Sequence, residues 1–202
     1  MDQMTKTGRI IFLNGTSSSG KTTIAKALQK VMSKAYLYVS VDNYLHQLPD
    51  AFLEDKDWIS QALPSLLAGF NNSSAAMAHA GNNVIIDQVL QESSWMEPCV
   101  QAFEGLDVVF IGVRCPLDVL EAREKARGDR QAGMALYQYD RVHSHGTYDV
   151  EVDSSKLSVD ECVSVIRKYV QSDQRPTAFE KLRAMTRDCE QGTAADADKP
   201  RR

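Results

Sequence analysis

The sequence predicts an α/β domain built on a mostly parallel β-sheet with helices packed against it. Two features carry this prediction. Short apolar runs alternate with longer amphipathic stretches along the chain, and the first apolar run leads into a glycine-rich loop that opens a helix. Such alternation is typical of strands joined by crossover helices. The chain of 202 residues is long enough for one domain with a sizeable core.

Five apolar runs predict the strands, because they are rich in Ile, Val, Phe and Tyr and end at polar or turn residues. They cover residues 9–14, 35–41, 83–89, 106–114 and 146–154. Five other stretches predict helices from amphipathic spacing, a proline start, a capping box or a glycine stop. They cover residues 20–34, 73–81, 91–103, 116–127 and 158–170. The pattern between 42 and about 72 is irregular, with helical pieces around 57–70.

The C-terminal part of the chain differs in composition from the rest. Residues 175–190 predict one more helix, and about the last twelve residues are small, polar and charged, which predicts a disordered tail. We therefore expect one domain over residues 1–171, followed by an added helix and a tail over 172–202.

Composition and charge argue against several classes of protein. The net charge is −4, which gives no general attraction to nucleic acid, and no apolar run approaches the roughly 18 residues of a membrane span. The N-terminus does not read as a secretory signal, so we expect a cytoplasmic protein. The four cysteines form no CxxC pair and predict reduced thiols. His143 and His145 have no visible third ligand, so we predict no metal site there.

A phosphate-binding loop follows the first strand. Residues 15–22 read GTSSSGKT, which fits GxxxxGK[ST]. Glycines let the backbone curl so that N–H groups face phosphate oxygens, and the helix that begins at Gly20 adds its positive end. Lys21 is expected to reach the β- and γ-phosphates, and Thr22 to ligate Mg²⁺. The candidate phosphate-binding residues are Gly15, Thr16, Ser17, Ser18, Ser19, Gly20, Lys21, Thr22 and Thr23.

Two acids end neighbouring strands of the predicted sheet. Ligands in open α/β sheets collect beyond the carboxyl ends of the strands, so these acids are candidate site residues. Asp42 follows the second strand and could accept the proton of an attacking hydroxyl; the alternative is a helix N-cap. Asp87 ends the third strand and could hold Mg²⁺ through a water or bind a substrate hydroxyl; the alternative is a plain turn.

Arginines gather after the fourth strand. Arg123, Arg127 and Arg130 lie along one helix face if the helix continues, and Gly128 allows a hinge beside the last two. Phosphoryl transfer needs cations over the developing charge, so we expect a lid over about residues 127–141 that brings Arg127 and Arg130 to the phosphates. A solvated helix face is the alternative, and for Arg123 it is equally favoured.

Several segments together resemble the chloramphenicol 3-O-phosphotransferase family. They are "IIFLNGTSSSGKT", "VSVDNYL", "VIIDQV", "IGVRCPLDVLEAREKARGDRQAGMA" and "VHSHGTYDVEVDSS", in order from about residue 9 to 170. The family belongs to the P-loop kinases. The resemblance implies a three-layer fold with a five-stranded parallel sheet in the order 2-3-1-4-5 and an arginine lid. It also implies ATP and Mg²⁺ as cofactors, Asp42 as catalytic base, and Arg127 and Arg130 as lid arginines.

The chain departs from this family in two places. Gln88 stands where the family's named member has a second acid after the strand-end Asp, and the segment from Leu45 to about residue 72 follows the family poorly. Both departures fall where an acceptor would be recognised. An apolar acceptor pocket is conceivable, bounded by Tyr44, Leu45, Phe52, Trp58 and Leu90.

The function expected from the sequence is transfer of the γ-phosphate of MgATP to a hydroxyl of a small molecule, with chloramphenicol or a related compound as the candidate acceptor. Lys21, Asp42, Arg127 and Arg130 would be catalytic, and Asp42 and Asp87 would bind the acceptor. Two alternatives remain open: an NTPase or nucleotide-binding regulator, with Gln88 as a conceivable water-orienting residue, and a kinase for nucleotides or polynucleotide ends. No nucleic-acid or membrane partner is expected, and the oligomeric state is open.

Overall fold

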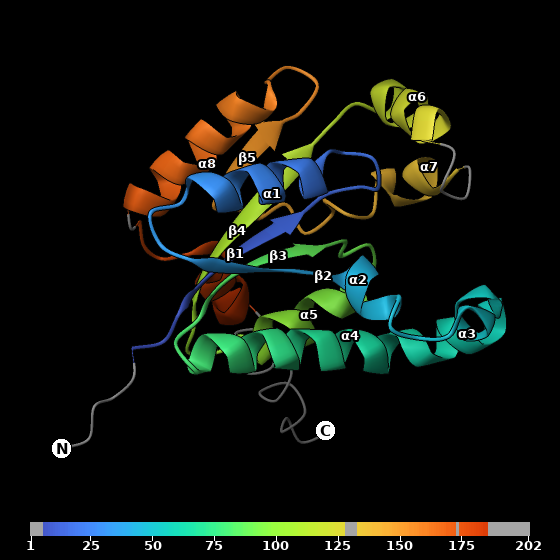
Figure 1. The fold of residues 1–202 in the computed structure, drawn as a ribbon, viewed down its shortest axis with the longest axis horizontal. Helices are drawn as coiled ribbons and strands as arrows, with labels where there is room; N and C mark the ends of the chain where they lie inside the picture. The colour runs from blue at the N-terminus through green and yellow to red at the C-terminus, as the bar shows by residue number, and fades with distance from the viewer. Residues whose placement is uncertain (1–5, 128–132, 173, 186–202) are drawn as a thin grey trace, which may run out of the picture.

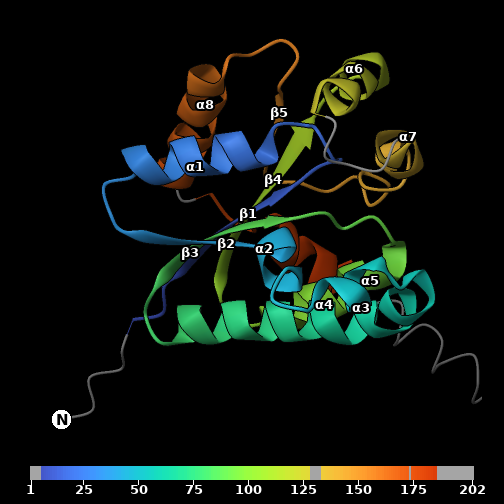
Figure 2. The ribbon, with the colours of Figure 1, turned by 45° about the vertical axis from the view of Figure 1, so that its right-hand side comes forward.

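The computed structural model describes residues 6–127, 133–172 and 174–185. In this part of the chain one parallel sheet lies between two layers of helices (Figures 1 and 2). The strands are β1 (Arg9–Asn14), β2 (Tyr36–Ser40), β3 (Asn83–Gln88), β4 (Asp107–Arg114) and β5 (Val150–Asp153). The helices are α1 (Lys21–Val31), α2 (Val41–Leu45), α3 (Asp50–Glu54), α4 (Lys56–His79), α5 (Ser93–Ala102), α6 (Leu117–Arg127), α7 (Met134–Tyr139) and α8 (Val159–Ser172).

The sheet has the strand order β2-β3-β1-β4-β5, and every neighbouring pair is parallel. This order confirms the expected fold. β1 lies at the centre, where Phe12 is level with Ile86 of β3 and with Phe110 of β4. All five strands therefore end at the same edge, and the loops that carry the candidate site residues meet there.

Both faces of the sheet are covered, which explains why the strands read as continuous apolar runs. Successive side chains of β1 alternate between the faces. Ile10 and Phe12 enter a core that includes residues of α4 and α5, whereas Ile11 and Leu13 enter a core that includes residues of α1 and α8. All four side chains are fully buried. The two cores fix the strands, and thereby the loops at their carboxyl ends.

One region differs from the sequence prediction. The irregular stretch and separate short helix expected between 42 and 81 are largely a single helix, α4, with Pro64 inside it. Asp55 caps this helix by accepting hydrogen bonds from the Asp57 and Trp58 N–H groups. The helix forms despite a proline because its buried residues repeat at spacings of three and four and pack under the sheet. They are Leu67, Phe70, Asn71, Ser74, Ala75 and Ala78.

The segment after residue 171, which the sequence sets apart from the domain, also reaches the core. Residues 178–185 are helical, and Phe179 is fully buried beside the rings of Phe12, Phe103 and Phe110. The expected tail lies outside the described residues. Because truncating a buried Phe to Ala costs about 3–5 kcal/mol, Phe179 ties this segment firmly to the domain.

The sequence predicts neither a membrane-spanning helix nor paired cysteines. Within them, no helix combines the length and apolar character needed to cross a lipid bilayer. Cys99, Cys115 and Cys162 are buried free thiols, and Cys189 lies outside the described residues. Burial raises the pKa of all three thiols.

Candidate active site

The phosphate-binding loop connects β1 to α1, as its spacing predicts. A Cβ atom at Gly15 would lie 2.5 Å from the Val113 carbonyl oxygen, so only glycine fits beside β4. Gly20 has φ +87°, a conformation that residues with a side chain rarely adopt, and helix α1 follows directly. These two glycines explain the spacing of the motif. The loop backbone is thus bent around the positive N-terminal end of α1.

Three side chains of the loop have buried polar atoms. Lys21 is 7 % exposed and donates to the Thr16 carbonyl oxygen at 2.9 Å, so its ammonium is held inside the loop. The hydroxyl oxygens of Ser18 and Ser19 are buried and have no hydrogen-bond partner among the described residues. An unpartnered buried hydroxyl costs about 1–3 kcal/mol, so the Lys21 ammonium and the Ser18 hydroxyl, which belong to residues that line the cavity, fit a bound phosphate.

Asp87 lies against the start of α1. Its Oδ2 atom accepts a hydrogen bond from the Thr22 hydroxyl at 2.6 Å and another from the Tyr38 hydroxyl at 3.0 Å. Burial, and then the negative charge of Asp87, raise the pKa of Tyr38 to about 12. Tyr38 therefore stays protonated and holds the carboxylate in place. Asp87 and Thr22 are hard oxygen donors side by side, which fits Mg²⁺, a cation that kinase sites bind through one or two carboxylates plus phosphate oxygens.

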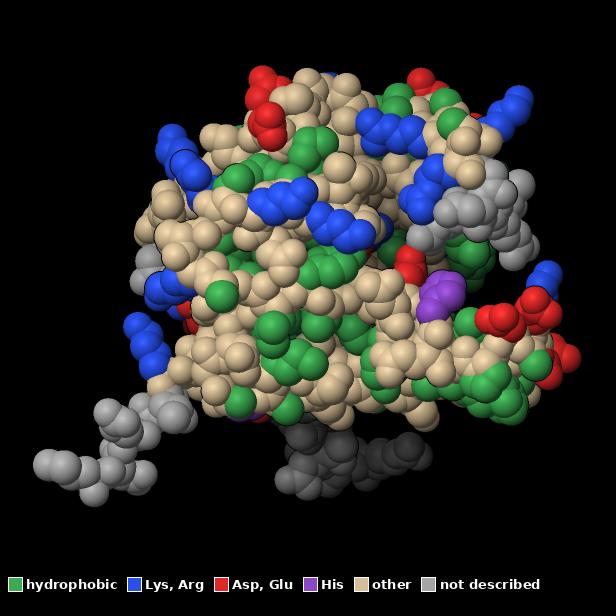
Figure 3. All heavy atoms as spheres, in the orientation of Figure 1, with side chains coloured by type: hydrophobic (Ala, Val, Ile, Leu, Met, Phe, Trp, Pro, Cys, Tyr) green, Lys and Arg blue, Asp and Glu red, His purple; other side chains and the backbone are tan. Residues whose placement is uncertain are grey.

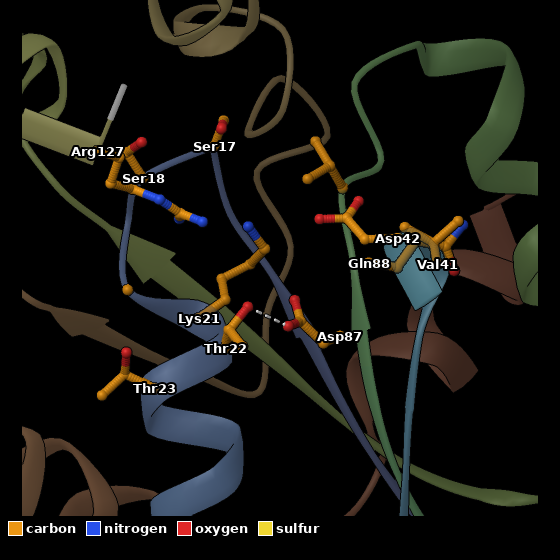
Figure 4. A pocket seen from close by; sticks show the side chains of 12 residues that line it. Ser17, Ser18, Lys21, Thr22, Thr23, Val41, Asp42, Asp87, Gln88 and Arg127 are labelled. Atoms are coloured by element: carbon orange, nitrogen blue, oxygen red, sulfur yellow. Dashed lines mark hydrogen bonds between the residues drawn. The ribbon is translucent and has the colours of Figure 1, made fainter. Parts of the chain in front are cut away.

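Asp42 lies across the same cavity from the loop. The residues that line this cavity are Ser17, Ser18, Gly20, Lys21, Thr22, Thr23, Val41, Asp42, Asp87, Gln88, Val89 and Arg127. Figure 4 shows the Asp42 carboxylate pointing into the cavity toward Lys21. Asp42 is not the N-cap of α2, because Ser40 takes that role by accepting from the Asn43 N–H at 3.1 Å. The helix-cap alternative for Asp42 is thus excluded, and its carboxylate lines the cavity.

The three arginines predicted near the site have different outcomes. Arg127 ends α6 and lines the cavity, with its side chain directed inward (Figure 4). Arg130 and the other residues between 128 and 132 lie outside the described residues, so the expected lid is only partly visible. Arg123 donates to the carbonyl and hydroxyl oxygens of Ser154 at 2.9 and 3.0 Å. The Ser154 hydroxyl in turn donates to the Ser19 carbonyl oxygen, which ties α6 to the phosphate loop.

A second cavity adjoins the first. It is a groove of about 460 Å³, a size typical of small-molecule sites. The two cavities share Val41, Asp42 and Val89. The other lining residues are mostly apolar and come from α2, α4, α5, α7 and the chain around them: Leu45, Leu63, Leu67, Gln91, Trp95, Gly133, Met134, Tyr137 and Gln138. Because Asp42 lines both cavities, a molecule in the groove lies next to that carboxylate.

Of the five residues named from the sequence as bounds of an acceptor pocket, only Leu45 lines this groove. Leu45 lines the groove, but Phe52 and Trp58 pack on each other with ring centroids 4.8 Å apart, and neither lines it. Tyr44 packs on Phe70, under the sheet. The aromatic residues that line the groove are Trp95 and Tyr137. These residues are far apart in sequence, and no local motif marks them.

Gln91, Gln138 and Tyr38 were also not found from the sequence. Gln138 accepts from the Ser17 N–H and donates to Gln91, and Tyr38 supports Asp87. For Tyr38 a local signal did exist. This tyrosine lies in the strand that leads to Asp42, and the alternation of side chains along a strand places it on the same face of the sheet as the phosphate loop. For the two glutamines there was none.

The prediction about a metal site at His143 and His145 stays a prediction; in the part of the chain that the structure describes, no group of three or more His, Cys, Asp or Glu side chains is arranged to hold an ion. Both imidazoles instead contact the Tyr148 hydroxyl, at 2.7 and 2.9 Å. The same hydroxyl accepts from Asn14, the residue before the phosphate loop, at 2.8 Å. Burial, and then the Arg114 charge, lower the pKa of His143 to about 3 and of His145 to about 4.

Comparison with solved structures agrees with the fold. A Mycobacterium tuberculosis APS kinase in complex with AMPPNP and APS aligns with a TM-score of 0.65 at 15% identity, over 82% of this chain and 98% of that one. The shikimate kinase of Acinetobacter baumannii with shikimate gives the same TM-score at 10% identity, over 85% and 97%. A tunicamycin resistance protein of Deinococcus radiodurans aligns at 0.56 and 20% identity, over 81% and 95%. These likenesses show the P-loop kinase fold.

Comparison of sequences is more specific. A Mycobacterium tuberculosis H37Rv protein, provisionally named an O-phosphotransferase, is 28% identical over 198 residues, which covers 87% of this chain and 88% of the relative. The model of the family described as chloramphenicol phosphotransferase-like protein matches residues 8–171, which include the phosphate loop, Asp42, Asp87 and Arg127. With that match over most of its length, the chain belongs to the chloramphenicol phosphotransferase-like family of P-loop kinases.

Proposed function

We propose that the protein transfers the γ-phosphate of ATP to a hydroxyl of a small, uncharged and largely apolar molecule, with chloramphenicol as a candidate acceptor. The observation that carries the proposal is the shared position of Asp42. This carboxylate lines both the cavity of the phosphate loop and the apolar groove. A general base for phosphoryl transfer must reach the acceptor hydroxyl and the terminal phosphate at once.

Each residue of the site has a distinct task in this proposal. The loop amides, the Lys21 ammonium and the Ser18 hydroxyl bind the phosphate oxygens. Asp42 accepts the hydroxyl proton and aligns the nucleophile, and Arg127 offsets charge on the transferred group. A magnesium ion held by Thr22 and Asp87 would supply further charge neutralisation on the phosphates.

The nucleoside of ATP has a matching place on the other side of the loop. A cavity of about 420 Å³ opens beside Gly20, Thr23 and Ile24 and is bounded by Arg123 and Ser154. Its remaining walls include Leu157, Val159 and Cys162, which are apolar. An apolar slot with a cation at its edge fits a purine, since a guanidinium stacks well on an aromatic face.

The charge around the groove argues for an uncharged acceptor. Among the described lining residues Asp42 is the only one of the types Asp, Glu, Lys and Arg. Acidic side chains gather around α3, beyond α2, as Figure 3 shows at the right of the face in view. They are Asp50, Glu54, Asp55 and Asp57. With no Lys or Arg among the groove-lining residues that the structure describes, the groove suits an uncharged acceptor better than an anionic one.

The test is acceptor-dependent release of ADP from MgATP, measured across a panel of hydroxylated compounds. The panel contains chloramphenicol, its analogue lacking the 3-hydroxyl, shikimate and a 5′-hydroxyl oligonucleotide. We expect ADP release and a phosphorylated product with an uncharged aromatic alcohol, and none with shikimate or the oligonucleotide. ADP release that is the same with and without every acceptor would indicate an NTPase instead. Label on the oligonucleotide end would indicate a polynucleotide kinase.

A further inference from the structure

Gln138 of α7 links the phosphate loop to the groove. Its side-chain oxygen accepts a hydrogen bond from the Ser17 N–H at 2.7 Å, across 121 positions of sequence. Its side-chain nitrogen donates to the Gln91 side-chain oxygen at 2.9 Å. Ser17 lines the phosphate cavity, whereas Gln91 and Gln138 line the groove. The Gln138 carboxamide therefore forms part of the wall between the two cavities.

The chemistry of the contact fixes the orientation of this carboxamide. A backbone N–H can only donate, so the oxygen of Gln138 must face Ser17 and the NH₂ group must face Gln91. Gln138 is 6 % exposed, and a buried amide that lost either partner would carry an unsatisfied polar group. Reversing the amide would break both bonds. Both hydrogen bonds are therefore made in one arrangement of the side chain.

A second attachment joins the end of α7 to the same part of the loop. The Asn14 side chain donates to the Val142 carbonyl oxygen at 3.0 Å, and the Gln138 carbonyl oxygen accepts from the Val142 N–H. Asn14 also accepts from the Leu90 N–H at 2.9 Å, next to the start of the loop that carries Gln91. The chain from 138 to 142 thus contacts Asn14, the residue before the phosphate loop, and Ser17 within the loop. Between these contacts lie Gly15 and Thr16.

We propose that Gln138 is a positioning residue for phosphoryl transfer, through which the acceptor groove and the phosphate loop act on each other. Holding the Ser17 N–H fixes the first turn of the loop, and the turn sets where the following amides point. The hydrogen bond to Gln91, which lines the groove, lets a molecule bound in the groove shift the same carboxamide. The proposal rests on the proposed function for the meaning of the groove, but its contacts can be tested without any acceptor.

The experiment compares isosteric variants. Gln138→Met keeps the length of the side chain and removes both hydrogen bonds, and Gln91→Met removes only the outer one. We expect Gln138→Met to speed hydrogen exchange of the Ser17 amide by about fivefold or more, the size of one hydrogen bond, and to weaken binding of AMPPNP, measured by calorimetry, to a similar degree. Gln91→Met should give smaller changes in the same direction. The double variant should match Gln138→Met alone, because the two bonds act in series.

Three comparisons separate positioning from general damage. Gln101→Met changes an exposed glutamine of α5 that contacts Glu97, and should leave exchange at Ser17 and AMPPNP binding as in the wild type. Thermal midpoints report whether each variant folds. Gln138→Glu keeps an oxygen for the Ser17 N–H but adds a negative charge near the phosphates, so it should retain slow exchange and still lose AMPPNP affinity.

Two results would overturn the proposal. The first is a folded Gln138→Met variant in which both hydrogen exchange of the Ser17 amide and AMPPNP affinity are as in the wild type. If Gln138→Met does not fold, fast hydrogen exchange of the Ser17 amide in folded Gln138→Glu overturns the proposal instead. The other is full additivity of the Gln91 and Gln138 effects. Failure of every acceptor in the ADP assay would count against the proposed function and would leave these binding and exchange results unaffected.

Discussion

The phosphate loop and the acceptor groove meet at Asp42 but are built in different ways. The loop is one short stretch of chain whose shape depends on two glycines and the start of α1. The groove collects side chains from α2, α4, α5, α7 and the segment after β3. A contiguous site is specified by local backbone chemistry, whereas an assembled site depends on packing between distant segments. Substitutions in the two regions should therefore fail in different ways.

The largest effect is expected at the loop. Lys21→Ala removes the buried ammonium and should lower turnover by about 10³-fold, at the upper end of what one electrostatic contact to a transition state contributes. Binding of ATP should weaken as well. Steady-state kinetics and calorimetry measure the two effects. Lys30→Ala, an exposed lysine later in α1, serves as the control. Unchanged kinetics in Lys21→Ala would contradict the assignment of the loop.

At the junction of the two regions the effect should be on chemistry alone. Asp42→Asn keeps the size of the side chain but removes the base, so turnover should fall by about 10²-fold or more. AMPPNP binding should stay within about twofold of wild type, because the phosphate contacts come from the loop. Asp50→Asn, in exposed α3, is the matched control. Transfer at the wild-type rate in Asp42→Asn would show that another group takes the proton.

In the groove the effect should be on the acceptor alone. Trp95→Ala removes an aromatic wall, and the KM for the acceptor should rise by about tenfold, which corresponds to about 1.4 kcal/mol of lost contact. The KM for ATP should not change. Trp58→Ala is a sharp control, because Trp58 packs on Phe52 and does not line the groove. An acceptor KM that responds to Trp58 rather than Trp95 would place the acceptor elsewhere.

The same contrast explains what the sequence could predict. The strand order, confirmed in full, was available through the family resemblance, and the loop followed from spacing. The unbroken α4 was missed because Pro64 argues locally against a helix, whereas the Asp55 cap and the buried stripe under the sheet outweigh it. Trp95 and Gln138 could not be found, since their roles depend on contacts with residues tens of positions away.

The smallest effect concerns the support behind the loop. The Thr147 N–H donates to His145 Nδ1, so neutral His145 carries its proton on Nε2 and donates to the Tyr148 hydroxyl. That hydroxyl also accepts from Asn14, and its own proton faces His143 Nδ1 at 2.7 Å and, less closely, the Val142 carbonyl oxygen at 3.4 Å. Both imidazoles must therefore be neutral. A proton on His143 would place a donor against the tyrosine's donor.

This arrangement predicts how stability depends on pH. Burial lowers the pKa of His143 to about 3 and of His145 to about 4, below the ordinary value of 6.5. At a pH between the lowered pKa of each histidine and 6.5, the unfolded chain binds protons that the folded protein does not. Stability contributed by the two neutral imidazoles is complete above about pH 6.5. It should fall as the pH drops toward 4, with a slope of up to about two protons.

Denaturant unfolding between pH 7 and 4.5 measures this slope. His143→Gln and His145→Gln should each reduce it by about one proton, because each removes one group that titrates on unfolding. His79→Gln, at the exposed end of α4, should leave it unchanged. Parallel curves for all four proteins would contradict the prediction. A reduced slope in the His143 and His145 variants, with full turnover at pH 7.5, would show that the two imidazoles contribute to stability without taking part in the transfer.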